Sequence, residues 1–141
     1  MVVENLETAY NYQDLDEYLL CFRDDFFFLT CPPDTFWGYD TEMLFHERMF
    51  SNVDDILLTL SGDAEWTWSG DSTGQSLELL RSFYMKVYYT SGSQNALALA
   101  EGQARFICRP DSSGDWYVWR WEDESEISDS LMTWTEIKAM F

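Results

Sequence analysis

His46 is the only histidine in the chain and the side chain best suited to acid–base chemistry near neutral pH. On a helical wheel it falls between Phe45 and Met49, inside the apolar arc of a helix expected to run to about Phe50. Glu42 lies one helical turn before it. An imidazole beside a carboxylate can act as a general acid or base. The simpler alternative is a histidine at the edge of the core, hydrogen-bonded to Glu42 or to a backbone carbonyl.

A second group of candidate residues lies in the stretch 114–123, which reads Gly-Asp-Trp-Tyr-Val-Trp-Arg-Trp-Glu-Asp. Aromatic and β-branched residues after a Ser-Ser-Gly-Asp turn are typical of a strand. Side chains alternate along a strand, so one face should carry Tyr117, Trp119, Trp121 and Asp123. Asp123 could therefore join His46 as a catalytic pair, or it could only cap the end of the strand.

The first two helices supply a further candidate, Tyr18. Spacing of apolar residues over 2–13 predicts an amphipathic first helix. Asp14, followed by Glu17, has the spacing of a helix N-terminus, and the helix after it carries an apolar stripe that includes Tyr18. This tyrosine would be either a hydroxyl facing a pocket or a residue of the core.

The elements that must position these residues follow from the spacing of apolar residues and from the prolines and capping residues that bound each element. Residues 26–31 form an apolar strand that two prolines end, and the helix of His46 begins at Asp40 or Thr41 after a loop. Strand patterns then cover residues 53–60, 76–89 and 96–108. A capping box at 133–136 begins a short helix expected to cover one end of the sheet. The chain is thus one α+β domain over residues 1–141, with helices gathered on one face of a curved antiparallel sheet.

Composition excludes several classes of protein. Eight basic against 26 acidic residues give a net charge of −18, which opposes nucleic acid and anionic membranes as partners. Three cysteines without a C-x-x-C spacing indicate neither a disulfide scaffold nor a zinc site, so no metal or cofactor is expected. No basic segment followed by an apolar run opens the chain, so a cytoplasmic protein is expected, although an exported form without its signal would look the same.

The order helix, helix, strand, helix, strands, ending in Gly-x-Trp-x-Val-x-x-Trp-x-Asp over residues 114–123, resembles the nuclear-transport-factor-2-like superfamily. This is the cone-shaped, cystatin-like fold shared by ketosteroid isomerases and polyketide cyclases. The resemblance covers almost the whole chain. It implies a pocket between helices and sheet, with Trp119, Trp121 and Asp123 on the pocket side. Small residues on the neighbouring strand, at 98, 100, 102 and 104, would either leave a cavity for a ligand or allow a helix to pack close to the sheet.

The resemblance also allows the catalytic types of the superfamily to be tested. The positions that match the ketosteroid isomerase residues look like Leu6, Cys31 and roughly Ala104, none of which can do that chemistry. Dehydratases similar to scytalone dehydratase use two histidines, and only His46 is present. What remains is a cyclase-like or dehydratase-like use of His46 with Asp123.

The most favoured function is therefore binding of a small, mainly apolar molecule in a pocket walled by Tyr18, Trp119 and Trp121. The alternatives are an enzyme that uses His46 and Asp123, and a non-catalytic dimerisation domain. Relatives often dimerise through the convex face of the sheet, where an apolar surface is expected here at Leu97, Leu99 and Ile107. A homodimer is accordingly expected.

Overall fold

The computed structural model describes residues 2–62, 67–71 and 74–141. Helices form at α1 (Val2–Tyr12), α2 (Leu15–Leu19), α3 (Tyr39–Asn52) and α4 (Trp134–Met140). The strands are β1 (Phe27–Leu29), β2 (Phe36–Gly38), β3 (Val53–Ser61), β4 (Thr67–Asp71), β5 (Gly74–Ser91), β6 (Gln94–Pro110) and β7 (Trp116–Ser125). The chain is α+β, as expected, and β2 lies where the sequence indicated a loop.

Two helices begin at the capping residues that the sequence indicated, but α3 does not: it begins at Tyr39 after Gly38, without a side-chain cap, and not at Asp40 or Thr41. The Asp14 side chain accepts a hydrogen bond from the Glu17 amide and begins α2. Thr133 and Glu136 form the complete capping box that begins α4. The predicted bounds of α1 and the predicted starts of α2 and α4 are confirmed to within two residues, because caps and apolar spacing are local features of the sequence.

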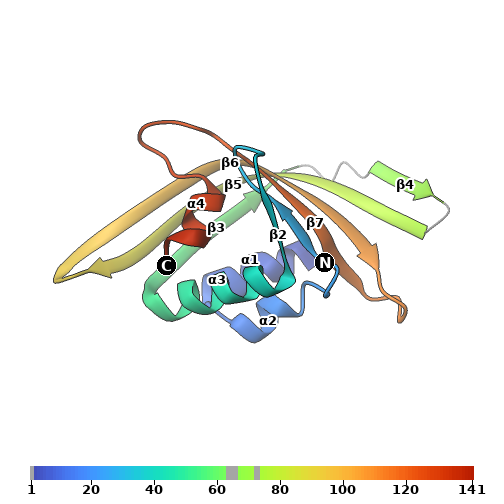
Figure 1. Cartoon of the computed structure of the whole chain (residues 1–141), viewed down its shortest axis with the longest axis horizontal. Helices are drawn as coiled ribbons and strands as arrows, with labels where there is room; N and C mark the ends of the chain where they lie inside the picture. The colour runs from blue at the N-terminus through green and yellow to red at the C-terminus, as the bar shows by residue number, and fades with distance from the viewer. Residues whose placement is uncertain (1, 63–66, 72–73) are drawn as a thin grey trace.

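One curved sheet runs through the molecule in the order β2-β1-β7-β6-β5-β3, and β4 adds to β5 (Figure 1). Neighbouring strands are antiparallel except β1 and β7, whose parallel register sets Phe28 beside Trp121. The expected antiparallel sheet is therefore mixed at this one position. Because β7 lies between β1 and β6, it occupies the middle of the sheet.

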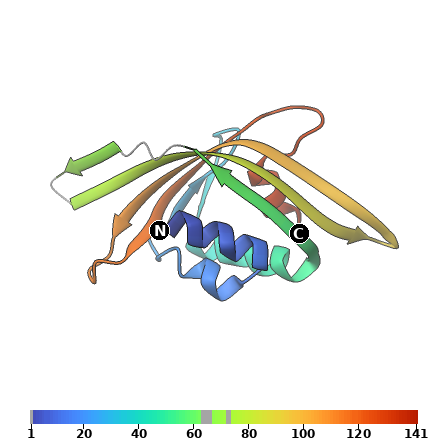
Figure 2. The same ribbon diagram turned by 180° about the vertical axis from the view of Figure 1, so that it is seen from behind.

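All four helices lie on one side of the sheet (Figures 1 and 2). We call the sheet face toward them the inner face and the opposite one the outer face. The inner face is apolar and buried along β5, β6 and β7, and its residues include Met85, Val87, Ala98, Ala100, Ala104, Phe106 and Trp121. The small side chains predicted on β6 thus face the helices.

A β-bulge in β7 corrects the predicted placement of Trp119. Ile107 pairs with Arg120, but its neighbour Cys108 pairs with Val118, so Trp119 has no partner on β6. The extra residue shifts the alternation by one position. Val118 and Trp121 face the helices, whereas Trp119 leaves the inner face and its ring lies against arginine side chains of the outer face. Simple alternation from the sequence could not reveal this shift.

Gly102 brings the end of β7 close to β6 and so directs the chain into α4. Its φ of +145° disfavours any side chain, and a Cβ there would lie 2.6 Å from the Ser125 Cα. After this close approach, the Glu126 amide donates to the Glu101 carbonyl, and the Met132 amide donates to the Leu99 carbonyl. These contacts guide the chain back below the sheet, where α4 contacts α3, β6 and β7.

Candidate functional site

Five polar side chains meet between the helices and the inner face, and we call them the interior cluster. They come from α1, α2, α3 and α4, and each is fully buried: Tyr10, Tyr18, Glu42, His46 and Lys138. Burial of two opposite charges and an imidazole in one small volume is uncommon, because ionised groups lose their hydration there. Hydrogen bonds must therefore account for every one of these groups.

Glu42 lies at the centre of the interior cluster. Its Oε1 accepts hydrogen bonds from the Tyr18 hydroxyl at 2.7 Å and from the Lys138 ammonium at 2.6 Å. Its Oε2 accepts from the Trp37 indole at 2.5 Å. A carboxylate with three donors, one of them charged, is well stabilised in its ionised form.

His46 connects Glu42 to α1. Its Nδ1 lies 2.8 Å from the Glu42 backbone oxygen, and a carbonyl can only accept, so Nδ1 carries the proton. Nε2 is then the acceptor for the Tyr10 hydroxyl at 2.6 Å. Tyr10 in turn accepts from the Trp134 indole at 2.9 Å. Both ring nitrogens of His46 therefore have a partner, and the ring stacks on Tyr18.

Burial and charged neighbours change the pKa values of three groups in the interior cluster, and the result is a cluster without net charge at neutral pH. Burial lowers the pKa of His46 to about 4, although Glu42 pulls in the other direction. Burial also lowers the pKa of Lys138 to about 8. For Glu42, burial alone would raise the pKa, but Lys138, His46 and the hydrogen bonds bring it below its usual value. At neutral pH the histidine is uncharged and the Glu42–Lys138 pair has no net charge.

Aromatic rings wall the interior cluster on the side of the sheet. The Lys138 ammonium lies 3.5 Å from the ring centre of Phe28 and 3.3 Å from that of Trp121. Trp134 meets Trp121 edge to face, with ring centres 4.5 Å apart. Trp121 is fully buried, yet among the described residues its Nε1 has no hydrogen-bond partner.

Asp123 lies at the end of β7, and its hydrogen bonds are those of the second role left open by the sequence, a cap for the end of the strand. One carboxylate oxygen accepts from the amide and the hydroxyl of Thr135, at 2.7 and 2.6 Å. The other accepts from the amide and the hydroxyl of Ser125. Both oxygens thus hold the start of α4 on the end of β7, and neither contacts His46 in the structure.

The structure brings some of the predicted site residues together and not others. His46, Glu42 and Tyr18 share the interior cluster, and Trp121 borders it. Asp123 accepts a hydrogen bond from the start of α4, the helix that carries Lys138. Trp119 lies on the outer face. Sequence reasoning missed Tyr10, Trp37, Trp134 and Lys138 as members of this site. One signal was available, because Lys138 lies one turn after Trp134 on the predicted terminal helix.

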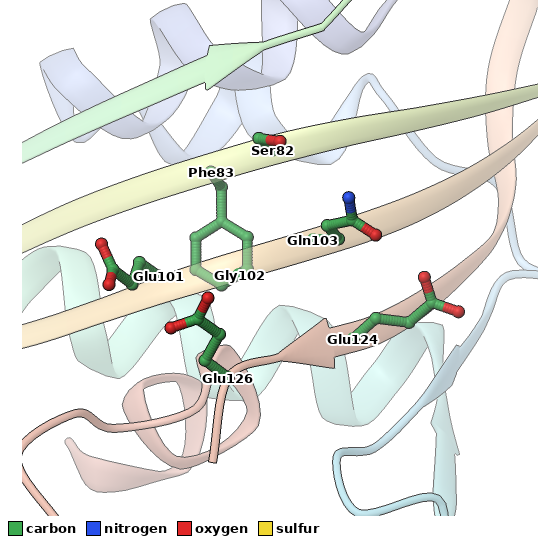
Figure 3. A pocket seen from close by; sticks show the side chains of 7 residues that line it. All are labelled: Ser82, Phe83, Glu101, Gly102, Gln103, Glu124 and Glu126. Atoms are coloured by element: carbon green, nitrogen blue, oxygen red, sulfur yellow. The ribbon is translucent and has the colours of Figure 1, made fainter. Parts of the chain in front are cut away.

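A surface hollow of about 490 Å³ lies elsewhere, between β5, β6 and the end of β7 (Figure 3). Its lining includes three carboxylates, Glu101, Glu124 and Glu126, beside Gly102. None of the predicted site residues reaches it. Glu124 also contacts Arg105, and an acidic hollow indicates no chemistry by itself.

Two further features are absent from the described part of the chain. Within it, no three His, Cys, Asp or Glu side chains are grouped so that they could hold a metal ion. No helix described there is both long and apolar enough to cross a membrane.

Comparison with known proteins supplies structural neighbours only. No family model and no curated protein matches the chain. A solved protein of Novosphingobium aromaticivorans, named as a candidate aromatic ring hydroxylase, matches with a TM-score of 0.74 and 17% identity over 97% of this chain and 91% of that one. A Salmonella enterica protein of the nuclear transport factor 2-like superfamily has a TM-score of 0.66 and 9% identity, covering 91% and 88%. The chain has the nuclear-transport-factor-2-like fold.

A third neighbour of this fold, from Novosphingobium aromaticivorans, is named as a candidate scytalone dehydratase. It has a TM-score of 0.73 and 13% identity, covering 93% of this chain and 83% of that one. Identities this low establish the nuclear-transport-factor-2-like fold and no particular activity. The function of this chain must be argued from its own residues.

Proposed function

We propose that the protein binds a small, mainly apolar, uncharged molecule that carries a hydrogen-bond acceptor, between the helices and Trp121. The observation that carries this proposal is the unpartnered, fully buried Nε1 of Trp121 beside the interior cluster. A buried donor without a partner costs about 1–3 kcal/mol. A bound carbonyl oxygen would remove that cost.

The surroundings of Trp121 support the same class of ligand. Lys138 donates one hydrogen bond to Glu42 and otherwise faces the rings of Phe28 and Trp121. The aromatic walls would contact the apolar part of the molecule.

Charge counting favours a neutral ligand over an anion. Glu42 already balances Lys138, and His46 is uncharged at neutral pH because burial lowers its pKa to about 4. A carboxylate placed here would add a buried negative charge with no cation left to balance it. A ketone, ester or amide oxygen adds an acceptor without adding charge.

Entry of a ligand requires α4 to withdraw, because Trp134 and Lys138 fill the space beside Trp121. Residues 126–130, which connect β7 to α4, are exposed, so the connection itself is free to move, whereas Trp134 and Lys138 must leave the core during entry and return to it afterwards. Binding is favoured over catalysis because both ring nitrogens of His46 and both oxygens of Asp123 already have partners.

Thermal unfolding with two probes of matched shape tests the proposal. Acetophenone carries a carbonyl and ethylbenzene carries none. A ligand at a hundred times its dissociation constant stabilises the folded protein by about 2.7 kcal/mol. We expect acetophenone to raise the melting temperature more than ethylbenzene does. Equal shifts for acetophenone and ethylbenzene, or no shift for either, would contradict the proposal.

The variant Trp121→Phe keeps the ring and removes the indole donor. We expect it to reduce the acetophenone shift to that of ethylbenzene. Trp68→Phe removes another tryptophan from the chain and is the matched control, in which the difference between the two probes should persist. A carbonyl preference that survives in Trp121→Phe would assign the acceptor contact to another group.

A second candidate function, assembly through the outer face, rests on a separate observation. Exposed apolar side chains gather on neighbouring strands of this face: Leu57, Leu80, Tyr84, Tyr88 and Leu97. Tyr88 pairs with Leu97 across β5 and β6, so the patch is continuous there. A second copy of the chain that packs sheet to sheet would cover these side chains and form the homodimer.

A further inference from the structure

The β-bulge of β7 builds an unusual group on the outer face. The Trp119 ring lies 3.5 Å from the guanidinium carbon of Arg109 and 4.5 Å from that of Arg120. Arg109 projects from β6 on the same face as Ile107, and Ile107 pairs with Arg120. The bulge therefore sets one indole against two arginines, which we call the outer arginine pair.

The outer arginine pair is uncompensated in a chain of net charge −18. Three other basic groups have carboxylate partners: Arg23 contacts Asp111, Arg105 contacts three glutamates, and Lys138 contacts Glu42. Among the described side chains, neither Arg109 nor Arg120 has a salt bridge or a hydrogen bond.

A second observation points to a ligand at this place. The Nε of Arg120 is buried from solvent and, within the described residues, has no hydrogen-bond partner. An unsatisfied buried donor on a charged group is costly, and stacking on an indole does not satisfy it. Stacking uses the flat face of a guanidinium and leaves its in-plane N–H groups without an acceptor, and an oxyanion can accept from two such groups.

Apolar surface borders the same group. The Arg120 guanidinium carbon lies 4.9 Å from the Phe27 ring centre, and Phe27 packs on Phe36 with ring centres 5.0 Å apart. Phe36 on the edge strand β2 is 64% exposed, so its ring is available to a ligand. A molecule held at the arginines would find aromatic contact beside them.

We propose that the outer arginine pair, with Trp119, Phe27 and Phe36, is a binding site for an aromatic carboxylate. The carboxylate accepts from the in-plane N–H groups of Arg109 and Arg120, and the aryl ring lies along the phenylalanines. The acidic remainder of the chain repels anions at long range, so selectivity comes from short-range contact and affinity is expected in the millimolar range. This site is separate from the interior cluster. It would bind an anion, whereas the site proposed beside Trp121 would bind a neutral molecule.

Titration of the ¹⁵N-labelled protein with benzoate tests this inference. The indole N–H signal of Trp119, assigned through Trp119→Phe, should move in a saturable way, while that of Trp121 stays in place. Benzamide, the neutral analogue, should leave the Trp119 signal unmoved. Inorganic phosphate should bind at least about tenfold more weakly than benzoate, because it lacks the ring.

Two variants and a matched control complete the experiment. Arg109→Gln and Arg120→Gln should each weaken benzoate binding about tenfold or more. Arg48→Gln removes one exposed positive charge from α3 and should leave the affinity within about twofold. A Trp119 signal that benzoate does not move, equal binding of phosphate or benzamide, or unchanged affinity in both arginine variants would overturn the inference.

Discussion

His46 is neutral in the folded protein because burial lowers its pKa to about 4, against 6.5 for an exposed histidine. Between these two values the unfolded chain binds a proton that the folded protein does not. Stability should therefore fall as the pH is lowered from about 6.5 toward 4, by on the order of 3 kcal/mol in total. Urea unfolding at several pH values measures this loss.

The variant His46→Gln separates this effect from other groups. Glutamine can accept from Tyr10 and has no charge at any pH. The wild-type loss between pH 6.5 and 4.5 should be largely absent from the variant, because the lowered pKa of Glu42 restricts its titration to still lower pH. Parallel pH profiles for the two proteins would show that His46 is not buried in its neutral form.

Asp123 should behave as a structural residue. In Asp123→Asn, an amide group replaces one of two oxygens that together accept four hydrogen bonds at the start of α4. We expect a loss of about 1–3 kcal/mol in the free energy of unfolding and faster hydrogen exchange in α4. Asp129→Asn, in the exposed connection, is the control and should change neither quantity. Unchanged exchange in Asp123→Asn would show that α4 is held by other contacts.

At the scale of elements, α4 is attached to α3 by one buried ion pair. Lys138→Met removes the cation and leaves Glu42 charged and buried, which should cost about 3–5 kcal/mol at pH 7. The double variant Glu42→Gln/Lys138→Met removes both charges, so it should be more stable than Lys138→Met alone. Chemical unfolding of the wild type, Glu42→Gln, Lys138→Met and the double variant completes a double-mutant cycle. Additive losses would mean that the two residues do not interact.

Local features of the sequence predicted much of the fold. The Asp14 cap, the Thr133 capping box and the helical spacing around His46 each depend on residues within one or two turns. The contact of Glu42 with Lys138 joins residues 96 positions apart, and no local pattern reports such a pairing. The bulge at Trp119 is set by the pairing of β6 with β7, so simple alternation put this residue on the wrong face.

At the scale of the whole molecule, the outer face carries two separate features. The apolar patch around Leu97 lies on β3, β5 and β6, while the outer arginine pair lies on β6 and β7. The two can therefore be tested independently. A dimer that uses the first need not cover the second.

Leu97→Glu should prevent dimer formation, because Leu97 is 48% exposed within the apolar patch and a charge there would be buried in the dimer. Ile127→Glu places the same charge at a residue that is 73% exposed in the connection to α4, and it should leave the assembly unchanged. Sedimentation velocity distinguishes the two states. A wild-type protein that sediments as a monomer at all concentrations would exclude this assembly.

The ligand proposal depends on one atom, the buried Nε1 of Trp121. Its N–H signal in the ¹⁵N spectrum reports directly on whether an acceptor is present. On titration with acetophenone, we expect a saturable downfield shift of this signal, and no such shift with ethylbenzene. A Trp121 signal that stays in place while acetophenone saturates the protein would rule out binding at Trp121.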